Sequence, residues 1–159
     1  MIVKGVIDED FVNYKVPSMS VVCPYCTFKC DKECGMSVCQ NSSLAKADVI
    51  DVSIDTLVKR YLRNPITKAI VLNGLEPFDS FEDVFKFIER IREFRKDDIV
   101  IYTGYNENEV ADYVNRLKNF GNIIIKFGRF VPNNQSHFDD VLGVYLASDN
   151  QYAKKNGTA

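Results

Sequence analysis

The stretch that decides the fold runs from Ala69 to Gly104 and reads "AIVLNGLEPFDSFEDVFKFIERIREFRKDDIVIYTG". It begins with a short apolar run at 69–74 that ends at a glycine, as is typical of a buried parallel strand. A second run of the same kind closes the stretch at 99–104. Between the two runs, apolar residues recur at helical spacing at positions 84, 87, 88 and 91. A strand, a helix and a strand in this order predict a right-handed crossover between parallel strands.

The same alternation continues on both sides of this stretch. The sequence predicts helices behind Ser53 (ending at Pro65), behind Ser80 as N-cap, and over 107–121 with Gly121 at the end. It predicts further strands around 20–22, at 122–128 and at 141–148. A closed eight-fold barrel needs roughly 250 residues, so we expect an α/β fold that forms a partial, incomplete βα barrel with a mainly parallel sheet. Residues 1–152 are expected to form one domain, and 153–159 ("AKKNGTA") a flexible tail.

Composition excludes several classes of function. The chain has 159 residues, 46% hydrophobic and 26% charged, which is typical of one globular domain. Its formal charge of −2 argues against a nucleic-acid partner or an anionic membrane surface. The N-terminal residues lack a basic segment followed by an apolar core, and no apolar run reaches the ~18 residues of a membrane span. We therefore expect a cytoplasmic protein.

All five cysteines lie between Cys23 and Cys39, inside a loop that we place at 23–41. Disulfides are rare in the cytosol, and an odd number leaves one thiol over, so clustered thiolates indicate metal ligands. Zinc remains an alternative, because Cys23 and Cys26 have the spacing of a zinc knuckle and Cys34 with Cys39 could complete four sulfurs. That arrangement would leave Cys30 beside the metal without a role. Zinc would make the protein a non-enzymatic interaction module.

A second interpretation uses three cysteines. Cys26-x3-Cys30 resembles the start of the radical SAM signature, and "CQN" at Cys39 resembles its close. Further blocks follow in matching order over almost the whole chain. They are "DFVNYKVPS" (10–18), "NGLEP" (73–77), "YTGY" (102–105), "FGRFV" (127–131) and "LASDNQ" (146–151). Together these blocks resemble the small activating proteins of anaerobic ribonucleotide reductase, a family of radical SAM enzymes.

The resemblance implies a radical SAM-like fold and a [4Fe-4S] cluster held by Cys26, Cys30 and Cys39. It also implies that S-adenosylmethionine binds the open iron and is cleaved reductively to methionine and a 5′-deoxyadenosyl radical. The radical would be passed to a glycine loop of the reductase large subunit. A one-electron donor such as flavodoxin or ferredoxin would be the second partner. The alternative within this class is another glycyl radical enzyme or a small molecule as substrate.

The resemblance also implies which residues bind S-adenosylmethionine. Gly74, Leu75 and Glu76, with Asn73 before them, match the turn that receives the methionine ammonium. Thr103 at the next strand end would face the same cavity. Apart from the resemblance, Arg129 is a candidate to pair with a carboxylate of the cofactor, and the alternative is a surface arginine. A β-branched residue at position 74 is expected to weaken cofactor binding by blocking its close approach.

Several positions depart from the family pattern. The usual Cys-x2-Cys close is Cys30-x8-Cys39 here, because 31–38 ("DKECGMSV") are inserted, and Cys34 within the insert offers a competing third ligand. We expect Cys39 to be the ligand, since Asn41 follows it as in the family. We expect Cys23 to point into the barrel or its rim as a small apolar residue. Leu75 stands where the family has a second glycine, and Phe127 where it has an aspartate.

Overall fold

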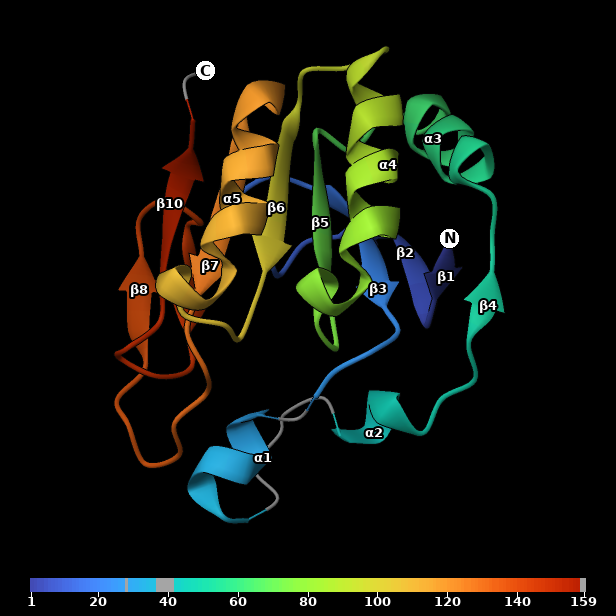
Figure 1. Cartoon of the computed structure of the whole chain (residues 1–159). Helices are drawn as coiled ribbons and strands as arrows, with labels where there is room; N and C mark the ends of the chain where they lie inside the picture. Colours follow the sequence, from blue (N-terminus) through green and yellow to red (C-terminus); the bar gives the residue numbers. More distant parts are fainter. Residues whose placement is uncertain (28, 37–41, 158–159) are drawn as a thin grey trace.

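The computed structural model describes residues 1–27, 29–36 and 42–157. Its centre is a six-stranded sheet in the order β10-β7-β6-β5-β3-β2 (Figure 1). The strands are β2 (Gly5–Asp10), β3 (Ser18–Cys23), β5 (Ala69–Gly74), β6 (Asp98–Tyr102), β7 (Ile123–Phe127) and β10 (Tyr152–Asn156). β3, β5, β6 and β7 are parallel, whereas the edge strands β2 and β10 are antiparallel to their neighbours. The expected α/β fold with a mainly parallel sheet is confirmed, and its closure into a partial barrel stays a prediction.

Two small ladders accompany the main sheet. β1 (Ile2–Val3) pairs with β4 (Ile50–Asp51), and β8 (His137–Asp139) pairs with β9 (Val144–Leu146). The strand predicted at 141–148 is therefore short, and it belongs to a hairpin outside the main sheet.

Three helices pack on one face of the sheet, as Figure 1 shows for α4 and α5 in front of the strands. They are α3 (Ile54–Arg63), α4 (Phe81–Arg92) and α5 (Ala111–Leu117), and the single turns η1 (Pro77–Ser80), η2 (Glu107–Val110) and η3 (Lys118–Phe120) flank the last two. α1 (Lys29–Cys34) and α2 (Ser42–Ala45) lie beyond the end at which β3 and β6 point (Figure 1). None of the helices described is long and apolar enough to cross a membrane.

The predicted helix ends are correct in part. The Ser53 hydroxyl accepts a hydrogen bond from the Thr56 amide (3.0 Å), which confirms Ser53 as the N-cap of α3. Ser80 occupies the N-cap position of α4, but its side chain makes no capping hydrogen bond. The reason is that η1 leads directly into α4, and the Glu76 side chain caps η1 instead.

The C-terminal segment differs from the expected tail, because 153–156 belong to β10. This strand pairs with β7 over five residues, and the Asn156 side chain donates to the Val114 carbonyl (2.9 Å). Its two lysines, Lys154 and Lys155, are exposed, while Ala153 packs against the sheet. A polar edge strand with two exposed lysines resembles a solvated tail in sequence, which explains why the sequence predicted a tail here.

The two faces of the central strands have different compositions. The face under the helices is apolar along its whole length. It is formed by Ile70, Leu72, Ile99, Ile101, Ile123, Ile125 and Phe127. The opposite face begins with Ala69, Val71, Val100 and Ile124, which Tyr14, Leu142 and Leu146 cover. Continuing along the same face, the alternation of side chains brings Asn73, Tyr102 and Lys126 to the carboxyl ends of β5, β6 and β7. Polar groups therefore gather at one end of one face.

Candidate cofactor site at the carboxyl end of the sheet

A cavity of about 410 Å³ lies at these strand ends. It brings together six of the nine predicted site residues: Cys26, Asn73, Gly74, Leu75, Glu76 and Thr103. Its wall is completed by Ile7, Asn13, Val22, Leu44, Tyr102, Gly104, Lys126, Gly128, Phe130 and Gln151. Parallel strands in an α/β fold place binding sites at their carboxyl ends, and the cavity follows that rule. Arg129 is not part of this wall. Cys39 and the side chain of Cys30 lie outside what the structure describes.

Backbone hydrogen bonds hold the turn after β5 against the start of the cysteine loop. β3 and β5 pair in parallel as far as Cys23 and Gly74. Beyond that point, the Leu75 amide donates to the Cys23 carbonyl (3.2 Å) and the Glu76 amide donates to the Tyr25 carbonyl (2.8 Å). The sheet ladder thus continues past both strands and fixes the turn beside Cys26.

Gly74 is required by this pairing. Its φ is +92°, a region that side chains disfavour, and a Cβ atom there would lie 2.5 Å from Val22 Cγ1 and 2.8 Å from the Cys23 amide nitrogen. A larger residue would therefore push against β3 and the first residue of the cysteine loop. The close contact adds a second reason to expect that a β-branched residue at position 74 weakens cofactor binding. Such a residue would displace the cysteine loop as well as block the approach of the cofactor.

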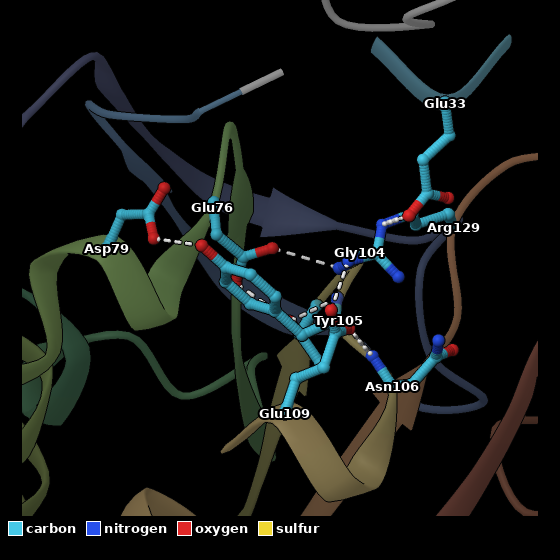
Figure 2. A network of polar contacts seen from close by, with 9 residues as sticks. Glu33, Glu76, Asp79, Gly104, Tyr105, Asn106, Glu109 and Arg129 are labelled. Carbon is cyan, nitrogen blue, oxygen red and sulfur yellow. Dashed lines mark hydrogen bonds and ion pairs between the residues drawn. The ribbon is translucent and has the colours of Figure 1, made fainter. Parts of the chain in front are cut away.

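Glu76 is the central acidic group of the cavity and is only 4% exposed. Its Oε1 accepts from the Thr103 hydroxyl (2.8 Å) and the Phe78 amide (3.1 Å), and its Oε2 accepts from the Gly104 amide (2.9 Å). Burial raises the pKa of Glu76 to about 7, although these hydrogen bonds act in the opposite direction. Figure 2 shows the carboxylate reaching from the β5 turn to Gly104 after β6. Glu76 therefore joins two neighbouring strand ends while it lines the cavity.

Asn73 supplies an acceptor that the protein leaves unused. Its Oδ1 is buried and has no hydrogen-bond partner among the described residues. Buried polar atoms are nearly always paired in native proteins, so an unpaired one in a cavity wall indicates a ligand position.

Arg129 faces other protein carboxylates instead of the cavity. Its Nη2 donates to Glu109 Oε1 (2.6 Å), and its Nε lies 3.3 Å from Glu33 Oε1 (Figure 2). Glu33 belongs to α1, within the inserted residues of the cysteine loop. These contacts hold Arg129 against the cysteine loop, and its expected contact with a cofactor carboxylate stays a prediction.

Asp79 holds the same loop from its other side. Its Oδ2 accepts from the Thr27 amide (3.1 Å), one residue after Cys26, and its Oδ1 accepts from the Tyr105 hydroxyl (2.6 Å). Burial, and next the hydrogen bond to Asp79, raises the pKa of Tyr105 to about 12. Asp79 and Arg129 thus anchor the cysteine loop at 27 and at 33, on either side of Cys30.

The described cysteines have distinct environments. Cys26 is partly exposed and lines the cavity, as expected of a ligand. Cys23 is fully buried in the core under the helices, and this burial, followed by the charge of Glu76, raises the pKa of its thiol. Its burial agrees with the expectation of a small apolar residue, whereas its place under the helices differs from the expected barrel interior or rim. Cys34 ends α1 and is partly exposed. The choice of Cys39 over Cys34 as third ligand stays a prediction.

Sequence reasoning missed Lys126. This residue lines the cavity and is only 7% exposed, and its ammonium donates to the carbonyls of Gly128 (3.0 Å) and Thr103 (3.4 Å). A signal for it exists in the sequence, since a lysine interrupts the apolar run "IIIKF" at the carboxyl end of a buried strand. Phe127, the departure at the next position, is buried under the helices and faces away from Lys126.

A second hollow, of about 670 Å³, lies between β2 and α3. Its wall consists of Asp8, Glu9, Thr56, Lys59, Arg60, Arg63 and Asn64. Most of these side chains are exposed, and Arg60 pairs with Asp8 (2.6 Å). This hollow is larger than the cavity, but it contains none of the predicted site residues. The smaller cavity is therefore the candidate site.

Comparison with known protein families identifies a match. A family model described as a 4Fe-4S single cluster domain matches residues 18–151, which run from the start of β3 through the cysteine loop to the last cavity residue. Neither a curated protein nor a solved structure matches the chain. Since the family model covers most of the chain, this protein belongs to the family of 4Fe-4S single cluster domains.

Proposed function

We propose that this protein is a radical SAM activating enzyme. It would hold a [4Fe-4S] cluster with Cys26, Cys30 and Cys39, bind S-adenosylmethionine in the cavity, and generate a glycyl radical on an anaerobic ribonucleotide reductase. The observation that carries the proposal is the single cavity shared by Cys26 and the turn from Asn73 to Glu76. The order of the sequence blocks that resemble the activating proteins supports the choice of substrate.

The residues present fit both groups. Cavities for small ligands typically measure roughly 300–1,000 Å³, and this one lies within that range. A thiol, the donor that iron–sulfur clusters require, stands on its wall at Cys26. The unpaired Oδ1 of Asn73 and the buried carboxylate of Glu76 offer acceptors for an ammonium group.

When bound, the cluster and S-adenosylmethionine would together supply one-electron chemistry that ends in removal of a hydrogen atom from a glycine. The protein's own residues bind and orient. Glu76 would attract the ammonium, and the Thr103 hydroxyl fixes the position of the Glu76 carboxylate. Val22, Leu44 and Phe130 give the wall its apolar part, which keeps water from the reacting atoms.

The open sheet leaves room for a protein substrate. We infer that the sheet and its covering segments form the incomplete barrel that the sequence predicted. Phe11 and Val12 are 63% and 75% exposed, and they directly precede Asn13, a residue of the cavity wall. Neighbouring exposed apolar side chains favour contact with another protein, so this segment is the proposed entrance for the glycine loop. Flavodoxin or ferredoxin would deliver the electron.

Anaerobic reconstitution with iron and sulfide tests the proposal first. We expect four irons per chain in the parent and their loss in Cys26→Ser. Zinc alone, with no iron retained, would contradict the proposal and favour the interaction module.

Mixing the reconstituted protein with the candidate reductase, S-adenosylmethionine and a reductant tests the reaction. We expect methionine, 5′-deoxyadenosine and a glycyl radical detected by electron paramagnetic resonance, with none of the three in Cys26→Ser. If both products form without a glycyl signal, the substrate is another glycyl radical enzyme or a small molecule.

A further inference from the structure

Asp79 contacts the backbone of a predicted cluster ligand. Its Oδ2 accepts a hydrogen bond from the Thr27 amide (3.1 Å), and this N–H belongs to the peptide group that joins Cys26 to Thr27. Asp79 lies in η1, the single turn that directly follows the cavity residue Glu76. The turn therefore fixes a carboxylate against the peptide group of Cys26.

The second oxygen of Asp79 is held as well. Its Oδ1 accepts from the hydroxyl of Tyr105, which comes from the segment after β6 (2.6 Å, Figure 2). Because the pKa of Tyr105 is about 12, this donor is neutral at pH 7, and so is the backbone amide on the other side. The two donors orient the carboxylate without cancelling its charge.

This contact bears on a cluster held by Cys26 in two ways. The reduction potential of an iron–sulfur cluster depends on nearby charge and on hydrogen bonds to its sulfurs. A reduced cluster carries one more negative charge than an oxidised one, and a carboxylate close by opposes that charge. A hydrogen bond to sulfur would favour the reduced form, but the Thr27 N–H is taken up by Asp79. Both effects lower the potential.

We propose that Asp79 is a positioning residue that keeps the cluster strongly reducing. It acts through the Cys26–Thr27 peptide group, by placing a negative charge there and by occupying the N–H. The inference rests on one part of the proposed function, the role of Cys26 as a ligand, and goes beyond it by assigning a property of the cluster to Asp79. A strongly reducing cluster would suit the proposed one-electron chemistry.

The reduction potential tests this role directly. The reconstituted parent and Asp79→Asn would be titrated anaerobically with dithionite, without S-adenosylmethionine, while electron paramagnetic resonance records the reduced cluster. Asparagine keeps the shape of the side chain without its charge. At a given potential we expect the ratio of reduced to oxidised cluster to be about 10-fold higher in Asp79→Asn, which for one electron is a rise in potential of about 59 mV.

Two control variants separate this charge from other effects. Glu89→Gln removes the same charge from an exposed position of α4 and should keep the parent's potential. Tyr105→Phe keeps the charge of Asp79 and removes one of its anchors, so the potential should not rise. Iron counting and thermal unfolding show whether each variant is loaded and folded. Asp79→Ser is a second neutral variant in case Asp79→Asn does not fold.

The outcomes separate this inference from the proposed function. A loaded Asp79→Asn with the parent's potential would overturn the inference and leave the proposed function standing. The inference also fails if either control raises the potential as much as Asp79→Asn, or if a folded Asp79→Asn does not take up four irons. A rise in Asp79→Asn alone, with a parent that does not cleave S-adenosylmethionine, would support the inference and contradict the proposed function. Four irons retained in Cys26→Ser would contradict both.

Discussion

The two faces of β5, β6 and β7 share the same backbone and differ in what their side chains do. Under the helices, Leu72, Ile101 and Phe127 continue the apolar core to the ends of the strands. On the opposite face, the neighbouring positions at those ends are Asn73, Tyr102 and Lys126, and all three line the cavity. One face is thus uniform, whereas the other changes from apolar to polar along its length.

The face under the helices supplies stabilising apolar contacts, and the polar end of the opposite face supplies the groups of the candidate site. Each apolar side chain buried under the helices contributes roughly 1.5–3 kcal/mol. Polar groups in the same place would lose hydrogen bonds to water, and a fold tolerates them only where other groups or a ligand replace those bonds. The polar end of the second face meets this condition through the Thr103 network and the cavity.

The largest expected effect concerns the cysteine loop beside the polar end. Cys26→Ser and Cys39→Ser should each abolish four-iron binding, because serine is a poor substitute for a thiolate ligand, while Cys34→Ser should retain it. Iron and sulfide counting after anaerobic reconstitution measures this. An intact cluster in Cys39→Ser together with its loss in Cys34→Ser would reverse the assignment of the third ligand.

Adjacent residues on β6 test the contrast between the faces directly. Ile101→Ala leaves a void under the helices and should lower the free energy of unfolding by about 2–5 kcal/mol. Tyr102→Phe removes only the hydroxyl that donates to the Asn13 carbonyl (2.6 Å) and should cost about 1 kcal/mol. Urea unfolding of the cluster-free protein gives both values, and equal losses would break the comparison.

The raised pKa of Glu76 predicts that the folding stability of the protein depends on pH. Its pKa in the folded protein is about 7, above the ordinary value of 4.5. The protonated carboxyl therefore makes its full contribution to folding stability below about pH 4.5, and this contribution is lost as the pH rises through 7. We expect the cluster-free parent to lose stability on the order of 3 kcal/mol over this range relative to Glu76→Gln, which cannot ionise. Asp79 and Lys126 are the other charged groups close by, and Cys23 stays neutral there.

Chemical unfolding at several pH values measures this difference. The same ionisation has the opposite effect on ligand binding, since an ammonium group binds the charged carboxylate. Affinity for S-adenosylmethionine should therefore rise with pH through about 7 in the parent and stay level in Glu76→Gln. Parallel stability curves for the two proteins would refute the raised pKa.

The smallest expected effect concerns the contact that holds the loop above the cavity. Glu33 is 59% exposed, so its ion pair with Arg129 is screened by water, and Glu33→Gln should change the unfolding free energy by less than about 1 kcal/mol. Arg129→Gln should cost more, because Arg129 is buried and also donates to Glu109. Thermal unfolding of the two variants compares them, and an equal or larger loss in Glu33→Gln would contradict this ranking.

The sequence predicted most of the central elements because their patterns are local. The run at 69–74 has the boundaries of β5, and the Ser53 cap begins α3 where expected. Elements at the margins were harder to predict. β10 resembles a tail because it is a polar edge strand, and η1 takes over the start of the helix predicted behind Ser80.

The candidate site was also predicted from the sequence only in part. A glycine and an acid after a buried strand mark a turn at the carboxyl edge, and the turn indeed shares a cavity with Cys26 and Thr103. Arg129 could not be placed by sequence position, because its partner Glu33 comes from an insert almost a hundred residues earlier. Sequence position likewise did not show that Lys126 is the cation at the cavity.

By itself, the sequence determined the parallel α/β alternation, the single cysteine loop and the strand end that faces it, since each depends on residues close together in the chain. Only the tertiary structure decided which charges meet. Lys126, Thr103 and Glu76 come from three different strand ends, and their contacts exist because β5, β6 and β7 lie side by side in one register. The spacing of residues along the chain carries no information about that adjacency until the sheet has formed.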